Sequence, residues 1–218
     1  MIYTGLSLVE QSGVPDFFVA FTHFLSKNFE RKIETSVAIG KHMAKQTDTN
    51  SDYSGSDILL DLEVMKNYNF HVVSLAMKYA PDSKTVIDFG AGMGTLSLIL
   101  REKFKIEPFC LEIDEANKEH LKKRGFKIFN ELSNVGNKVD LIFSSNVLEH
   151  IENDVSVLRD MKTQLKEGGK LFLYLPAKML LWSDLDEEAG HYRRYEHSEI
   201  IKKCEQVGLT IETVHFAD

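Results

Sequence analysis

The chain has 218 residues, 43% of them hydrophobic, with a formal net charge of -7 and an isoelectric point near 5.6. This is enough apolar material for one α/β domain and an extension. The acidic balance argues against a general nucleic-acid-binding protein, which needs a clustered basic surface. No apolar run reaches the roughly 20 residues that span a bilayer, and no signal peptide is recognisable, so we expect a cytoplasmic protein without a membrane span.

The first 50 residues are the least informative part of the sequence. Phenylalanines recur at helical spacing after Pro15, and a second helical pattern covers residues 31–45. We predict that residues 1–52 form a helical N-terminal extension, serving as a cap or as the arm of a homodimer. A polar run before residue 53 separates it from the main domain, residues 53–218.

Strand and helix patterns alternate through this main domain. Their order predicts an α/β fold: a Rossmann-like, doubly wound, mostly parallel sheet with helices on both faces. In such sheets ligands bind at the carboxyl ends of the strands. The expected strands cover 86–89, 106–111, 126–129, 139–145, 170–175 and 209–214, and the expected helices 56–79, 96–100, 115–124, 155–165 and 198–207.

Three glycines follow the strand 86–89, at positions 90, 92 and 94. Glycine permits a sharp turn and lets a ligand lie against bare main chain, and the N-terminus of the next helix directs free N–H groups to the same place. The turn indicates a nucleotide-like ligand, with a ligand-free strand-to-helix turn as the alternative.

Acidic side chains stand at two neighbouring strand ends. Glu112 is placed to accept two hydrogen bonds from ribose hydroxyls, or it is a solvated surface carboxylate. Asp88 either holds an ammonium group or orders the glycine turn.

The segments Asp88–Gly94 and Asn146–His150, with Glu112 between them, resemble class I S-adenosylmethionine-dependent methyltransferases. The similarity runs from about Asn67 to Phe216 and is strongest to the broad bacterial methyltransferase-domain group, whose pattern Gly190–Tyr195 also matches. It implies S-adenosyl-L-methionine as cofactor and an in-line methyl transfer to a small-molecule or lipid-precursor substrate. The residues that it implies for the cofactor are Asp88, Gly90, Ala91, Gly92, Glu112, Ile113, Asn130, Asn146 and Val147.

A loop of about 20 residues follows the strand 170–175, and loops of this length are commonly functional. His191 is the candidate general base if the acceptor is a hydroxyl; alternatively it only holds the loop. Arg193 and Arg194 are candidates to clamp an anionic substrate. The alternative is that both arginines fold the loop by pairing with Asp184, Asp186 or Glu187.

Glu149 and His150 are adjacent potential metal ligands. Without a third ligand at a recognisable spacing they are weak evidence for a metal. We therefore expect no metal site and a structural loop at this point.

Two other functions fit the glycine-rich turn. One is an NAD(P)-dependent oxidoreductase, which the position of Thr95 disfavours because the third glycine of the dinucleotide fingerprint would fall there. The other is a non-catalytic, cofactor-binding regulatory module.

Enzymes of the resembling class insert an antiparallel strand between the fifth and the last parallel strand. No residues remain after Asp218 to form it. Either these two strands are bridged differently, or the domain is C-terminally truncated and has an unpaired edge. We expect a natural chain that is longer.

Overall fold

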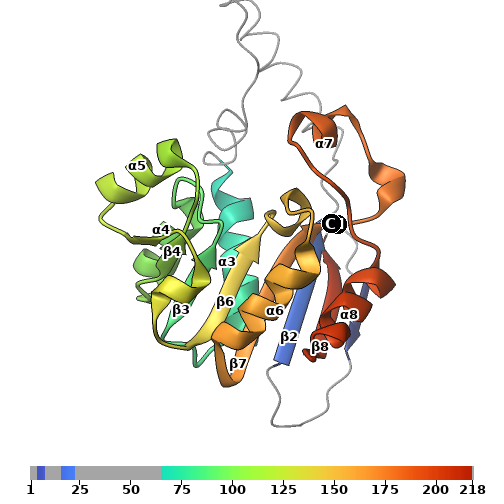
Figure 1. The fold of residues 1–218 in the computed structure, drawn as a ribbon, viewed down its shortest axis with the longest axis horizontal. Coiled ribbons are helices and arrows are strands. Elements are labelled where there is room, and N and C mark those ends of the chain that lie inside the picture. Colours follow the sequence, from blue (N-terminus) through green and yellow to red (C-terminus); the bar gives the residue numbers. More distant parts are fainter. Residues whose placement is uncertain (1–3, 8–15, 23–64, 218) are drawn as a thin grey trace, which may run out of the picture.

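The computed structural model describes residues 4–7, 16–22 and 65–217. They form one eight-stranded sheet of order β1-β8-β2-β7-β6-β3-β4-β5, with the helices α6 and α8 in front of it in Figure 1. The pairs β2–β7, β7–β6, β6–β3, β3–β4 and β4–β5 are all parallel. The predicted doubly wound α/β fold is confirmed.

The elements follow the expected alternation closely. The strands are β1 (Thr4–Ser7), β2 (Asp16–Thr22), β3 (Val86–Phe89), β4 (Phe109–Leu111), β5 (Lys127–Phe129), β6 (Val139–Ser145), β7 (Leu165–Pro176) and β8 (Thr210–Ala217). The helices are α3 (Lys66–Tyr79), α4 (Thr95–Phe104), α5 (Glu115–Lys123), α6 (Asp154–Gln164), α7 (Asp184–Glu188) and α8 (His197–Gln206), with the short 3₁₀ helices η1 (Leu132–Val135), η2 (Leu148–His150) and η3 (Met179–Leu181). None of these helices is long and apolar enough to cross a membrane.

The expected helix after Pro15 is wrong over residues 16–22, which form strand β2. The segment Asp-Phe-Phe-Val-Ala-Phe-Thr is apolar and rich in aromatic residues, a composition that favours strands. An interior parallel strand is apolar almost throughout, and this pattern was mistaken for a helical face. The second helix at 31–45 and the boundary at 52 lie outside the described residues, so the cap or homodimer arm stays a prediction.

Strand β2 lies between β7 and β8 and is parallel to both. Of the two alternatives considered from the sequence, β7 and β8 are therefore bridged differently, by β2. Strand β1 pairs antiparallel with β8 and forms the edge of the sheet.

Two apolar layers enclose the sheet. On one face, buried side chains of α6 and α8 pack with Ile87, Ile142 and Leu173. On the other face, α3 and α4 pack with Phe143 and Phe172, whose rings stack at 5.4 Å. A sheet covered on both sides can bind polar ligands only at its strand ends, which directs attention to the carboxyl edge.

The position of β2 makes a testable prediction. Because β2 has hydrogen-bonded neighbours on both sides, its amide hydrogens should exchange as slowly as those of β7, whereas those of the edge strand β1 should exchange faster. Hydrogen exchange followed by mass spectrometry measures this. Fast exchange across 16–22 together with protection of β7 contradicts the placement.

Candidate active site

The glycine turn connects β3 to α4 at the carboxyl edge. Gly90 and Ala91 donate their N–H groups to the Leu111 carbonyl at 2.9 and 3.0 Å. Gly90 has a φ of 74°, and a Cβ added to it would lie 2.4 Å from Cγ2 of Val147. The turn is thus held against the end of β4 on one side and against the residue that follows Asn146 on the other.

Glu112 ties the same turn to the end of β4. Its Oε2 accepts the N–H of Gly92 at 2.7 Å, and its Oε1 accepts the N–H groups of Ile113 and Asp114 at 2.7 and 2.9 Å. A carboxylate offers about four acceptor positions, so one remains on Oε2. One ribose hydroxyl can donate a hydrogen bond there without displacing a backbone donor. The sequence had led us to expect two such hydrogen bonds.

Asp88 is buried below the turn and accepts a hydrogen bond from the Ser97 hydroxyl at 2.5 Å. Burial raises the pKa of its carboxyl to about 7. Ser97 lies in α4, so this bond links the strand to the helix across the turn. It supports the alternative in which Asp88 orders the glycine turn.

The other predicted cofactor residues lie along the same edge. Ile113 follows β4 and is 76% exposed, so its side chain is open to contact a ligand at this edge. Asn130 follows β5 and is exposed. Asn146 follows β6 with a φ of 52°, and its N–H donates to the Tyr174 carbonyl at 2.8 Å. The fold therefore brings the predicted cofactor residues together on neighbouring strand ends.

The loop after β7 contains α7 and is fixed by its two arginines. Arg193 donates to the carbonyls of Ile151 and Glu152, each at 2.8 Å, and pairs with Asp154 at 2.8 Å. Arg194 is buried, and its Nε donates to Oδ1 of Asp186 at 2.8 Å. These contacts support the alternative in which the arginines fold the loop.

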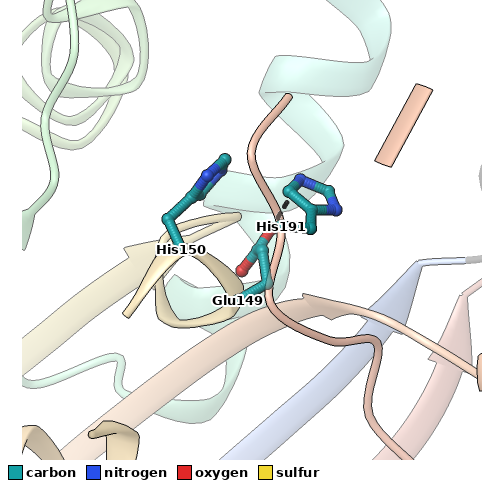
Figure 2. A group of neighbouring side chains, drawn as sticks. All are labelled: Glu149, His150 and His191. Carbon is teal, nitrogen blue, oxygen red and sulfur yellow. Dashed lines mark ion pairs between the residues drawn. The ribbon is translucent and has the colours of Figure 1, made fainter. Parts of the chain in front are cut away.

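His191 lies beside Glu149 and His150, which project from η2, as Figure 2 shows. We call these three residues the Glu149 cluster. Their potential ligand atoms all lie within 4.8 Å of one another. The His191 Nε2 is 4.0 Å from Glu149 Oε1, and the two imidazole rings meet edge to face at 4.6 Å. The His191 Nδ1 is 2.8 Å from Oδ1 of Asp186.

Glu149 is the unusual member of the cluster. Its side chain is 0% exposed, yet neither carboxylate oxygen has a hydrogen-bond partner among the described residues. Burial, reinforced by the nearby Asp186, raises the pKa of this carboxyl to about 8. Desolvation also lowers the pKa of both histidines, which disfavours the charged form of each ring. A buried acid without a partner is unfavourable for folding and marks a candidate functional position.

The sequence interpretation missed this cluster because it found only two adjacent candidate ligands. The third, His191, comes from a loop far along the chain and reaches Glu149 only in the fold. The sequence did contain a signal for it. The motif Asn146–His150 follows β6, and the motif Gly190–Tyr195 ends the long loop after β7, so both lie at the carboxyl edge of the sheet.

Comparison with known protein families identifies the family to which this chain belongs. The family described as "Methyltransferase domain" matches residues 62–214, and the chain belongs to this family. It is therefore an S-adenosylmethionine-dependent methyltransferase of class I. The carboxyl edge fits this cofactor, because Glu112 at the end of β4 retains an acceptor position for a ribose hydroxyl. The oxidoreductase and the non-catalytic module are set aside.

Solved structures share the fold. The methyltransferase complex with the Haloferax volcanii Trm112 activator has 17% identity and a TM-score of 0.57, over 74% of this chain and 78% of that one. A Thermotoga maritima protein described as a "possible histamine N-methyltransferase" has 19% identity and a TM-score of 0.52, over 64% and 68%. The mitomycin 7-O-methyltransferase MmcR has 20% identity and a TM-score of 0.51, over 64% of this chain and 48% of that one.

Replacing Gly90 by alanine tests the close approach of the turn to Val147. Gly90→Ala combines left-handed backbone strain, about 1–2 kcal/mol, with a steric clash against Val147. Gly136→Ala is the matched control, because Gly136 also has a positive φ but no atom within 4 Å of its added Cβ. Urea unfolding should show the larger loss for Gly90→Ala, partly restored by Val147→Ala. Equal losses at the two glycines contradict the packing.

Replacing Glu112 by glutamine tests the ribose contact. Hydrogen bonds to a charged group contribute roughly 1.5–3 kcal/mol, so Glu112→Gln should weaken S-adenosylhomocysteine binding roughly 10- to 100-fold. Glu115→Gln is the control, because this exposed glutamate is the first residue of α5 and forms an ion pair with Lys118. Calorimetry measures both affinities. A loss below about threefold means that Glu112 does not hold the ribose.

Proposed function

We propose that this enzyme transfers the methyl group to a hydroxyl of a small-molecule or lipid-precursor acceptor by in-line displacement. The acceptor oxygen attacks the methyl carbon, the carbon–sulfur bond breaks, and the sulfonium leaves as the neutral thioether S-adenosylhomocysteine. The hydroxyl proton leaves the acceptor. Positioning and exclusion of water supply much of the rate of such a reaction.

One observation carries the choice of a hydroxyl. The buried, unpartnered carboxyl of Glu149 lies in the cluster two residues after Val147, which contacts the glycine turn. An acceptor bound there would meet Glu149 and two imidazoles whose pKa is lowered by desolvation. A hydroxyl acceptor must lose a proton, which a thioether or tertiary amine does not have. The imidazoles can accept this proton and the Glu149 carboxyl can relay it.

A small acceptor is favoured over a nucleic acid by charge. The net charge is -7, and nucleic-acid substrates are held largely by basic phosphate contacts. MmcR, whose name describes an O-methyltransferase, is consistent with small-molecule chemistry on this fold.

The arginines of the loop have a positioning role in this proposal. Arg193 is bound to backbone carbonyls and Asp154, and Arg194 to Asp186. They hold His191 and Tyr192 over η2, where the Tyr192 N–H donates to the Glu149 carbonyl at 2.8 Å. The anionic substrate considered from the sequence is not part of the proposal.

A cytoplasmic location fits the cysteines. Cys110 and Cys204 are both free and buried, as is usual where thiols stay reduced.

The test is a methyl-transfer assay with a panel of acceptors. Small phenols, hydroxy acids and a prenylated phenol are each incubated with S-adenosylmethionine, alongside their already methylated ethers and a short RNA. S-adenosylhomocysteine should form with at least one hydroxyl compound and not with its ether. Turnover with RNA alone, or with ether and hydroxyl alike, contradicts the proposal.

Variants of the cluster sharpen this test. Glu149→Gln should lower kcat by roughly a hundredfold or more, the usual scale for losing proton-transfer catalysis, and leave S-adenosylhomocysteine affinity unchanged. His120→Ala, on α5 away from the cluster, is the control and should keep full activity.

A further inference from the structure

We propose that Glu149, His150 and His191 together bind one divalent transition-metal ion that takes mixed nitrogen and oxygen ligands, such as Zn²⁺, Mn²⁺ or Co²⁺. Binding of the ion is independent of the proposed function. Only the role given to the ion below rests on it.

The ligand geometry is close to that of a metal site. Metal–ligand bonds to histidine nitrogen and carboxylate oxygen are about 2.0–2.2 Å, so two atoms on one ion lie at most about 4.4 Å apart. The His191 Nε2 and Glu149 Oε1 are already 4.0 Å apart, and all three ligand atoms fall within 4.8 Å. Binding of one ion therefore requires side-chain rotations that draw the ligand atoms together by less than about 1 Å.

The buried carboxyl of Glu149 is an independent indication of a missing partner. Both of its oxygens lack hydrogen bonds from the described residues, and the side chain is fully buried. The nearby buried arginine, Arg194, directs its Nε to Asp186 instead. A bound cation would satisfy the carboxylate, which is otherwise costly to bury.

The surroundings of His191 match those of a metal-binding histidine. Metal-bound histidines usually donate their second ring N–H to a carboxylate, which fixes the ring and its tautomer. Asp186, itself 1% exposed, takes this place at 2.8 Å from Nδ1. Arg194 and the N–H of Ser183 hold Asp186 in turn. With the proton on Nδ1, the lone pair of Nε2 is left for the ion.

Three protein ligands leave coordination positions open, as in catalytic rather than structural sites. His150 is exposed, so the cluster can be reached from solvent. The ion would bind the acceptor oxygen there and lower the pKa of the hydroxyl. With the ion bound, the three side chains would serve as its ligands in place of the proton relay of the metal-free cluster, and the hydroxyl proton would pass to solvent before the oxygen attacks the methyl carbon. His191 acts as a ligand in this arrangement and not as the general base.

The test is metal binding by the untagged full chain after treatment with a chelator. Calorimetry with ZnCl₂ or MnCl₂ should show one equivalent bound with a Kd of roughly micromolar or tighter. Co²⁺ should give visible absorption bands characteristic of nitrogen ligation. Glu149→Gln and His150→Ala should each weaken binding by about tenfold or more, while His120→Ala should not.

The proposal is overturned if the wild-type chain binds none of these ions stoichiometrically, or if both cluster variants bind as tightly as wild type. Circular dichroism of each variant checks that it is folded, and the wild-type titration does not depend on the variants. S-adenosylhomocysteine is titrated in parallel. If it binds and no metal does, only the metal site is wrong; if metal binds and the cofactor product does not, the proposed function is wrong and the site stands.

Discussion

The carboxylate of Glu112 is the contact on which the cofactor end of the molecule depends. By accepting the N–H of Gly92 and those of two residues after β4, it fixes the glycine turn to the neighbouring strand. The turn cannot move away on its other side, because Val147 packs against Gly90. Three consecutive strand ends, those of β4, β3 and β6, are therefore locked together, and the cofactor site is a property of the sheet edge as a whole.

Two buried aspartates organise the loop after β7 in a similar way. Asp186 joins His191 to Arg194 within the loop, and Asp154 receives Tyr195, Arg193 and Lys203. Ion pairs at such partly buried positions hold geometry more than they add stability. They place His191 over η2, so the loop after β7 is attached to the segment that follows Asn146 at the end of β6.

The sequence was sufficient to predict those elements whose signal comes from neighbouring residues. The glycine turn between β3 and α4 and the apolar runs of β6 and β7 each depend on residues adjacent along the chain, and their places in the fold were predicted correctly. The ribose contact of Glu112 stays a prediction. Strand β2 was not, because an apolar aromatic run fits either a helical face or a buried parallel strand, and only its pairing with β7 and β8 decides. The Glu149 cluster was missed for the same reason, because His191 is remote in sequence from Glu149 and His150. The unpartnered state of Glu149 has no sequence signature.

The central claim is that the carboxyl edge binds S-adenosylmethionine through the turn and Glu112. Titration calorimetry of the full chain with S-adenosylhomocysteine and with NAD tests it most directly. The account predicts one site for S-adenosylhomocysteine and no measurable heat with NAD. Binding of NAD without any response to S-adenosylhomocysteine would contradict it.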